Sequence, residues 1–367
     1  MRIDTKSTAR FGQDPLSWLD VAAADQRGVR WISETNLCVY DAEVARDLLR
    51  NKDGRLQDHS DFFGDGAEAL SPRPVQVALG RACLARVLDH LRGVDLAAAL
   101  AVLGARSDWP RAGNELLFAI MRPILAAPAR SPNFRRALDR MVEARICRRH
   151  DPPPSWLARV ADRFRFFRAF THERESTEAT AHDDLFALVV EAGEAMDDEA
   201  LARLYAGFVF ALVGSIGFAL GWSLLLALRH DAIHHHPAHL VHESLRLYPI
   251  AWLLDHRVSR PETILGEQVT PAHILSISPY AIHRNPLYWP EPTAFRPGRW
   301  QGLTERNAWL PFGAGGHSCI AVSLSLDLIA KLLTALFEGK VRLDDPGGPP
   351  SIGAALAPPK FALVRGD

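Results

Sequence analysis

The sequence of 367 residues predicts a mainly α-helical fold with small β-sheets. Three segments have the length and apolar content of helices, namely 78–93, 205–228 and 321–337. Two other regions alternate apolar and polar residues as strands do. We expect a single domain, 1–367, with helix-rich parts at about 77–250 and 319–338, β-rich parts at about 28–40 and 250–282, and a largely irregular stretch at about 283–321.

Local signals predict the N-terminal elements in order. Residues 28–41, GVRWISETNLCVYD, alternate around a polar turn and predict a short hairpin. Asp41 is then the expected N-cap of a helix over 41–51. Residues 54–74 are rich in Gly, Asp and Pro and predict a loop. Residues 95–170 predict helices interrupted by prolines.

The segment 205–228 contains no charged residue and is long enough to cross a bilayer. A transmembrane helix is therefore one interpretation. However, four glycines lie along the segment, and a helix that is apolar on all sides is equally typical of the core of a large protein. We favour the buried helix and expect no membrane partner. After residue 250, alternating segments predict strands that precede a proline-rich run.

The composition excludes some classes of function. Basic and acidic residues number 42 and 43, so the chain lacks the positive charge of a nucleic-acid-binding protein. The four cysteines are widely spaced and form neither a CxxC pair nor a disulfide framework, which fits a reducing cytoplasm. The first residues contain no apolar signal core. We expect a cytoplasmic monomer that binds no nucleic acid.

Cys319 lies in the stretch PFGAGGHSCIA, between a glycine-rich turn and the predicted helix 321–337. The glycines allow positive φ angles and the close approach of a flat ligand. Amide N–H groups at the start of a helix favour the thiolate form of a cysteine. Such a thiolate is able to bind a heme iron as its axial ligand. The alternative is a buried structural cysteine beside a turn.

The stretch resembles the cysteine signature of the cytochrome P450 family, in which an aromatic residue, a glycine and a basic residue precede the ligand. Phe312, Gly315 and His317 occupy these positions before Cys319, and Ala321 replaces the usual glycine with another small residue. The resemblance implies heme b (iron protoporphyrin IX), with Cys319 as the ligand of the iron. It also implies that the heme lies between the central helix and the cysteine loop. The implied cofactor-binding residues are Cys319, His317, Arg257, Phe312, Gly313 and Gly315.

Three charged residues match the family's supporting network. Glu243-x-x-Arg246 places two side chains one helical turn apart, although Glu43 and Arg46 share that spacing. The order of the segments is more informative. Glu243 and Arg246 precede a strand-like run, then HRNPLYWPEPTAFRPGRW, then the cysteine turn. That middle run resembles the family's meander, which implies a buried network of Glu243, Arg246 and Arg299 that specifies geometry and performs no chemistry.

The resemblance also assigns the cations that bind the heme propionates. His317 and Arg257 match these positions. The alternative for Arg257 is a solvated charge on a strand. A further cation from the helix over 76–92 is not identified, because Gln76, Arg81 and Arg86 lack the usual spacing. Basic residues of that helix are an alternative contact for an acidic electron-transfer partner.

Six histidines are concentrated between 230 and 242, and three of them share a helical spacing. A zinc site is one interpretation, but no acid or cysteine completes the ligand set. Pro237 is expected to begin the helix that carries Glu243, so we favour a solvated loop and helix face.

The central helix departs from the family pattern. Relatives that use dioxygen carry an acid followed by threonine near the heme, where the pair relays protons. Gly214-Ser215 or Ile216-Gly217 occupies that place here, depending on the register, and neither pair supplies a carboxylate. Ser215 is our candidate proton relay. The candidates for an apolar substrate pocket are Phe218, Ile250, Ala251 and Trp252.

We therefore expect a heme-thiolate monooxygenase that oxidises a small organic molecule in specialised biosynthesis. The resemblance implies that its electrons come from a ferredoxin with its reductase, or from a flavodoxin. The missing acid supports an alternative, in which the heme enzyme uses peroxide or catalyses a redox-neutral dehydration, rearrangement or cyclisation. A second alternative is a non-catalytic recruitment module with the same fold, which the intact Cys319 loop argues against.

Overall fold

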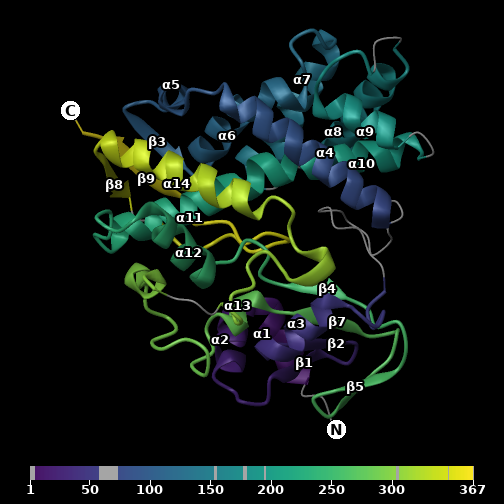
Figure 1. Cartoon of the computed structure of the whole chain (residues 1–367), viewed down its shortest axis with the longest axis vertical. Helices are drawn as coiled ribbons and strands as arrows, with labels where there is room; N and C mark the ends of the chain where they lie inside the picture. The colour runs from purple at the N-terminus through teal and green to yellow at the C-terminus, as the bar shows by residue number, and fades with distance from the viewer. Residues whose placement is uncertain are drawn as a thin grey trace. The chain divides into compact units, whose positions relative to one another are not determined.

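The computed structural model describes residues 5–57, 73–152, 155–176, 180–193, 196–302, 306–345 and 347–366. The chain is mainly helical with small sheets, as the sequence predicts (Figure 1). It divides into two compact units, each assembled from distant segments. The first comprises Met1–His59, His234–Val322 and Ile352–Leu356, and the second comprises Ser60–Ile233, Ser323–Ser351 and Ala357–Asp367.

The first unit contains a four-stranded sheet with the order β1-β2-β7-β4. The predicted hairpin is confirmed, because β1 and β2 pair antiparallel. Strand β7 runs parallel to β2 and antiparallel to β4, so residues more than 200 positions apart share one sheet. The strands of this unit are β1 (Val29–Ser33), β2 (Asn36–Val39), β4 (Leu254–His256), β5 (Glu262–Ile264), β6 (Glu267–Val269) and β7 (Ile274–Ile277).

Side-chain caps set the starts of the helices in this unit. The Asp41 carboxylate accepts a hydrogen bond from the backbone N–H of Val44 at 2.9 Å, which confirms its N-cap role. Pro237 begins α12, as predicted. The helices are α1 (Thr5–Gln13), α2 (Pro15–Ala23), α3 (Ala42–Arg50), α12 (Pro237–Leu247) and α13 (Pro279–Ile282), with short 3₁₀ turns η4 (Pro297–Trp300) and η5 (Gly315–His317).

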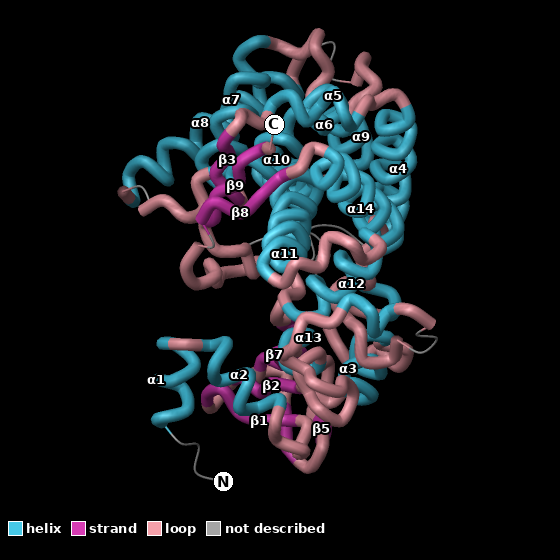
Figure 2. Tube along the Cα trace, turned by 90° about the vertical axis from the view of Figure 1, so that its left-hand side faces the viewer, coloured by secondary structure: helices cyan, strands magenta, loops and turns pink. Residues whose placement is uncertain are grey.

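Helices make up most of the second unit (Figure 2). Its sheet has three antiparallel strands, β3 (Arg106–Trp109), β9 (Phe361–Arg365) and β8 (Val341–Asp345). Most of the predicted loop over 54–74 lies outside the described residues. The helical elements are α4 (Arg73–Arg92), α5 (Leu96–Ala99), η1 (Leu100–Val102), α6 (Arg111–Leu125), α7 (Pro132–Val142), η2 (Glu143–Cys147), α8 (Trp156–Arg174), α9 (Leu185–Ala192), α10 (Asp198–Val209), η3 (Phe210–Ser215), α11 (Ile216–Arg229) and α14, which spans Val322–Glu338 and so begins at the last residue of the first unit's 234–322 segment.

The predicted central helix comprises α10, a π-helical turn η3, and α11. This helix, Asp198–Arg229, is long and apolar enough to cross a membrane, but 83% of its most apolar window is buried within the structure. Twelve residues of α11 are buried, and they include Trp222 and Phe218. Burial of this extent is typical of a core helix, and it favours that interpretation over a membrane span.

Candidate heme-binding site

The loop before Cys319 is held by its own backbone. The N–H of Cys319 donates to the carbonyl of Phe312 at 2.9 Å, and the N–H of Ser318 donates to the carbonyl of Gly315 at 3.3 Å. Gly315 has a φ of +67°. A Cβ at Gly315 would overlap the Cα of Arg50 at the end of α3. The loop therefore touches α3 backbone to backbone, which only glycine permits at this position.

Cys319 differs from the other cysteines in its access to solvent. Of the four cysteines, all of which the structure describes, Cys319 is exposed and the remaining three are buried. Burial raises the pKa of the Cys83 and Cys147 thiols to about 12, which makes them inert at neutral pH. Cys319 is thus the one accessible thiol.

The surrounding protein also raises the pKa of Cys319, even though the side chain keeps a path to solvent. Removal from water is the larger cause, and the N–H of Ala321 acts in the opposite direction. The sequence argument expected amide groups to favour the thiolate, and the N–H of Ala321 acts in that direction, but the effect of burial on the pKa is larger. Cys319 precedes the first residue of α14 by three positions, so one amide rather than a set of them faces the sulfur. A bound metal ion would deprotonate the thiol directly.

The residues of the loop fit a flat apolar cofactor bound through sulfur. Ile320, beside the ligand, exposes 44% of its surface. A Cβ at Gly316 would have no atom within 4 Å. The ring of Phe312 is half-buried and lies 5.8 Å from that of Trp309. The accessible sulfur of Cys319 lies next to the apolar side chain of Ile320 and the uncovered backbone of Gly316. This arrangement fits heme b bound through a thiolate. His317 lies in η5, but its side chain is outside the described set, so its propionate role stays a prediction.

The structure brings the three predicted network residues together. The guanidinium of Arg246 donates two hydrogen bonds of 2.9 Å to the carboxylate of Glu243, and Arg299 donates one of 3.0 Å. The side chains of Glu243 and Arg246 have no exposed surface, and that of Arg299 is 11% exposed. Arg246 also donates to the carbonyls of His283, Pro292 and Ala294. The network therefore fixes α12 to the irregular chain before the cysteine loop.

His283 and Trp300 belong to this assembly, although the sequence analysis did not identify them. The indole N–H of Trp300 donates to Glu243 at 2.9 Å. His283 is fully buried, and its Nε2 accepts from the N–H of Leu310 at 2.7 Å while its Nδ1 donates to the carbonyl of Arg246 at 3.0 Å. Burial, together with the nearby Arg246, lowers the pKa of His283 well below its usual value. A neutral imidazole thus links α12 to Leu310, the residue before the cysteine loop.

Arg257 lies after β4 and is half-buried. Its guanidinium donates to the carbonyls of Ala272 at 3.1 Å and Pro271 at 3.3 Å. These bonds hold the side chain over the turn before β7. Among the residues that the structure describes, no carboxylate forms an ion pair with Arg257, which is compatible with a propionate partner. The propionate role stays a prediction.

Ser215 ends the π-helical turn of the central helix. Its Oγ is buried and finds no hydrogen-bond partner among the described residues. Two residues later, Gly217 packs against α6, where an added Cβ would overlap Oδ1 of Asn114. Asn114 is fully buried, and its Nδ2 donates to the carbonyl of Ile146 in the second π-helical turn, η2. Since π-helical turns are rare and often lie at functional sites, this part of the helix is a candidate for chemistry.

The four predicted pocket residues lie in two places. Phe218 is fully buried on α11, with its ring 6.3 Å from that of Phe210. Ile250, Ala251 and Trp252 form one segment of the first unit. The indole of Trp252 donates to the carbonyl of Gly353 at 2.7 Å, so this side chain anchors the segment 352–356. Their role as pocket lining stays a prediction.

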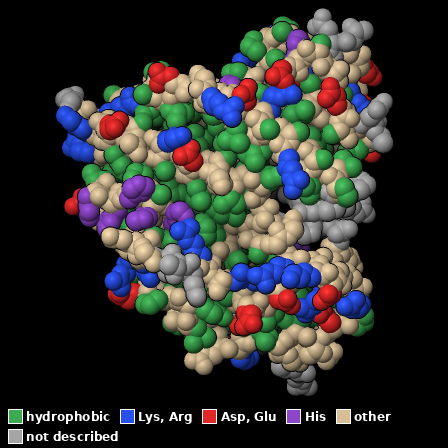
Figure 3. Space-filling view, viewed as in Figure 1, with side chains coloured by type: hydrophobic (Ala, Val, Ile, Leu, Met, Phe, Trp, Pro, Cys, Tyr) green, Lys and Arg blue, Asp and Glu red, His purple; other side chains and the backbone are tan. Residues whose placement is uncertain are grey.

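The histidine-rich segment holds no metal site in the part of the chain that the structure describes. The rings of His234 and His235 lie 4.4 Å apart, and those of His236 and His239 lie 5.4 Å apart. Histidine side chains gather on one face of the molecule (Figure 3). The zinc interpretation rests on a helical spacing of His235, His239 and His242. Because the helix begins at Pro237, His235 lies outside it and does not share that spacing.

A helical fold with small sheets, an accessible cysteine after a glycine turn, and a buried Glu-Arg-Arg network together define a heme-thiolate protein. The family described as Cytochrome P450 matches residues 238–337. This stretch contains Glu243, Arg246, Arg299 and Cys319, so the cysteine loop and its supporting network lie in the part of the chain that is similar to the cytochrome P450 family, whose cofactor is heme b.

Two relatives from Streptomyces melanosporofaciens are similar to part of the chain. One, named cyclooctat-9-en-7-ol 5-monooxygenase, is 43% identical over 28% of this chain and 23% of its own length. The other, named cyclooctatin synthase, is 34% identical over 34% of this chain and 27% of its own length. The match thus spans about a quarter of the length of these relatives.

Among solved structures, a mutant of P450 EryK in complex with erythromycin B superimposes with a TM-score of 0.72. The superposition covers 97% of both chains at 18% sequence identity. At this identity the likeness establishes the fold, and the chain has the fold of cytochrome P450 heme domains.

Proposed function

We propose that this chain is a monooxygenase that oxidises a small organic molecule in specialised metabolism. The observation that carries the proposal is Cys319, the one exposed cysteine, on a glycine turn that His283 and the buried Glu243 network support. When bound, heme b supplies the redox chemistry that activates oxygen. The names of the two Streptomyces relatives support a biosynthetic oxidation.

The residues of the chain have separate roles in this proposal. Cys319 holds the iron, and Phe312, Gly313 and Gly315 shape the face on which the porphyrin lies. Arg257 and His317 neutralise the propionates. Ser215 holds a proton at Oγ for delivery to the reacting centre, and Phe218, Ile250, Ala251 and Trp252 line an apolar pocket. We further propose a ferredoxin-type electron donor, a cytoplasmic location and a monomeric state.

A second candidate function follows from the central helix. The chain contains no Asp or Glu between Glu199 and Asp231, so Ser215 has no carboxylate neighbour along its helix. Its unpaired Oγ is a weak acid by itself. This favours, as the alternative, an enzyme that uses peroxide or catalyses a redox-neutral dehydration or cyclisation.

The ligand assignment is tested by spectroscopy of the purified protein. The wild type should contain heme b, and its reduced carbon monoxide complex should show the red-shifted band of thiolate ligation. The Cys319→Ser variant should lose this band because a hydroxyl replaces the thiolate. Cys83→Ser is the matched control and should keep the band, since Cys83 is buried on α4. A band that persists in Cys319→Ser would show that the assignment is wrong.

A further inference from the structure

Helix α8 (Trp156–Arg174) is apolar on two opposite faces. Phe166, Ala169 and Phe170 are buried on the inner face. Trp156, Leu157, Val160 and Phe164 project from the other, and their exposed fractions are 66%, 69%, 46% and 57%. At about 100° per residue, these four side chains lie within an arc of about 100° that is opposite the buried face. Single exposed apolar residues are ordinary, whereas four on one helical face indicate a binding surface.

Arginines border this exposed face on both sides. Arg159 and Arg163 flank one side, and Arg165 and Arg168 flank the other. The guanidinium of Arg168 lies 5.7 Å from the centre of the Phe164 ring. Between residues 156 and 169 there are four arginines and one aspartate, although the whole chain has a net charge of −1. Arg163 forms an ion pair with Glu199, and Arg165 forms one with Asp162, so the positive charge beside the apolar face comes mainly from Arg159 and Arg168.

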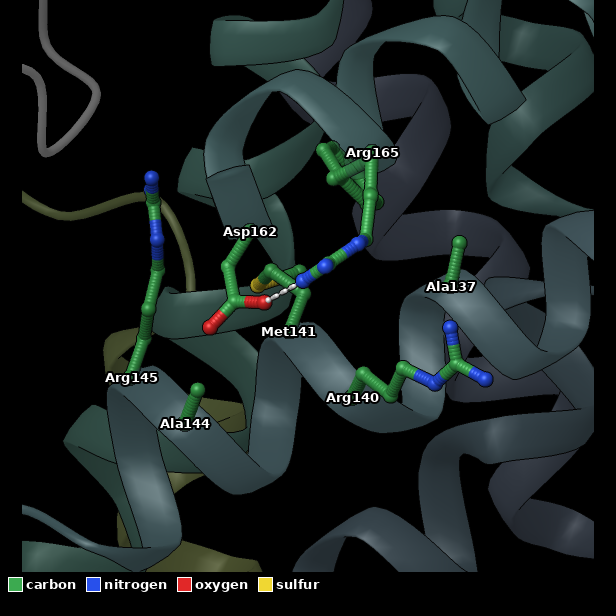
Figure 4. A pocket seen from close by; sticks show the side chains of 8 residues that line it. Ala137, Arg140, Met141, Ala144, Arg145, Asp162 and Arg165 are labelled. Atoms are coloured by element: carbon green, nitrogen blue, oxygen red, sulfur yellow. Dashed lines mark hydrogen bonds and ion pairs between the residues drawn. The ribbon is translucent and has the colours of Figure 1, made fainter. Parts of the chain in front are cut away.

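The inner side of α8 is closed by contacts within the protein. Arg165 pairs with Asp162 at 2.8 Å beside a small pocket, which Arg140, Met141 and Arg145 also line (Figure 4). This pocket faces α7 and η2, so it offers no groove on the outer side of the helix. The outer face is therefore a convex row of large side chains. Such a row suits insertion into a soft apolar layer better than docking into a shaped protein surface.

We propose that the exposed face of α8 binds the surface of an anionic lipid bilayer. Trp156, Leu157, Val160 and Phe164 would enter the boundary between headgroups and acyl chains, about 5–10 Å deep. The bordering arginines would remain at the phosphate level, since their long stems let the charge reach water. Trp156 at the edge of this patch suits the boundary, because its indole ring has an apolar part for the acyl chains and an N–H group for water. The contact is peripheral and reversible, and it does not depend on the heme reaction. It differs from a membrane span, but it revises the expectation from the sequence that the chain has no membrane partner.

Vesicle binding tests this proposal with the full-length, heme-loaded protein. Co-sedimentation is measured with phosphatidylcholine vesicles that contain either no anionic lipid or about one third phosphatidylglycerol. Binding should require phosphatidylglycerol and should weaken as the salt concentration rises from about 0.05 to 0.5 M. The Arg159→Gln/Arg168→Gln variant should lose about fivefold in partitioning per arginine. The Trp156→Ser/Leu157→Ser variant should lose about tenfold or more in partitioning, because each substitution removes a large apolar side chain that the bilayer would cover.

Matched controls lie elsewhere on the surface. Val21 and Leu287 are 61% and 60% exposed, so Val21→Ser/Leu287→Ser removes similar apolar surface. Arg92 on α4 has an exposed guanidinium, and Arg92→Gln removes one such charge. Both controls should bind vesicles like the wild type. No binding of the wild type to anionic vesicles would overturn the proposal. It would also be overturned if the α8 variants bound lipid normally but lost self-association, or lost binding to an acidic protein.

Discussion

Glu243 is the residue on which the support of the cysteine loop depends. Its carboxylate accepts five hydrogen bonds, which come from Arg246, Arg299, Trp300 and the backbone N–H of Arg296. A buried ion pair adds little net stability, but removal of one partner leaves an uncompensated buried charge. The function of the network is therefore to fix geometry.

The Glu243→Ala variant should lose about 3–5 kcal/mol in free energy of unfolding and retain little heme. Urea unfolding and the heme-to-protein ratio measure these effects. The matched control is Glu43→Ala, because Glu43-x-x-Arg46 on α3 has the same spacing on an exposed part of the surface. That variant should change the free energy of unfolding by less than about 0.5 kcal/mol. Similar behaviour of the two variants would contradict the role of the network.

His283 makes the stability of the same region sensitive to pH. Its folded pKa is lowered well below the usual 6.5, since the ring is buried and faces Arg246. The unfolded chain therefore takes up a proton as the pH falls below about 6.5, while the folded protein does not. The stabilisation is complete above that pH and is lost as the pH falls toward the folded pKa.

The free energy of unfolding should consequently decrease below about pH 6.5, by up to about 1.4 kcal/mol per pH unit from this residue. In the His283→Asn variant that part of the slope should disappear, although the variant is less stable at every pH. Urea titrations between pH 5 and 8 compare the slopes. An unchanged slope in His283→Asn would assign the acid sensitivity to other groups.

At the scale of elements, the contact of α6 with the central helix fixes the turn that carries Ser215. Gly217 leaves space for Asn114, whose amide also reaches the π-helical turn η2. The side-chain amide of Asn114 thus contacts both helices that contain a π-helical turn, at Gly217 after η3 and at Ile146 in η2. The placement of Ser215 depends on this contact because η3 directly precedes α11.

The Gly217→Ala variant should lose about 1–3 kcal/mol in free energy of unfolding, since its Cβ would overlap Asn114. Asn114→Ala removes the side-chain amide that the Cβ of Ala at position 217 would overlap. The double variant should therefore be more stable than the sum of the single effects predicts, and the coupling should be about 0.5–3 kcal/mol. Urea unfolding of the four proteins gives this value. Additive effects would show that Gly217 and Asn114 do not constrain each other.

Much of this architecture was predictable because its signals are local. Asp41, Pro237 and the glycine turn before Cys319 act on neighbours within a few residues. The assembly around Glu243 was predictable only from a family resemblance, and His283 was missed, because its two partners lie 27 and 37 positions away. Asn114 was missed for the same reason. The π-helical turns have no recognised sequence pattern that would distinguish them from ordinary helix.

At the scale of the whole molecule, the open question is the oxidant. A positioned general acid contributes about 10²–10⁴-fold to proton transfer, and our candidate for this role on the central helix is the hydroxyl of Ser215, without a carboxylate on that helix beside it. We expect oxygen-dependent turnover in which reducing equivalents also escape as hydrogen peroxide. The fraction lost should be large, because an unassisted hydroxyl delivers protons slowly unless the substrate or water takes part.

The test uses any compound that shifts the heme spectrum, under three conditions: ferredoxin with its reductase and labelled dioxygen, hydrogen peroxide alone, and no oxidant. Label in the product under the first condition, with measurable peroxide release, is the expected result. Ser215→Ala should increase the fraction of electrons that is lost as peroxide. Its free energy of unfolding should change by less than about 0.5 kcal/mol, because the Oγ of Ser215 has no hydrogen-bond partner among the described residues. Ser223→Ala is the matched control, because its hydroxyl donates to the carbonyl of Ala219 on the same helix, and it should leave the peroxide fraction unchanged.

Other outcomes distinguish the alternatives. Equal turnover with peroxide alone would make the protein a peroxygenase, and product without oxidant would make it a redox-neutral enzyme. In either case Ser215→Ala should leave product formation unchanged, because no reducing equivalents are supplied that could escape as peroxide. The protein could show thiolate ligation by Cys319 while no tested compound shifts the heme spectrum. That result would favour the non-catalytic recruitment function. The intact ligand loop argues against that outcome, since a protein that only recruits partners has no need for an accessible thiol held in this geometry.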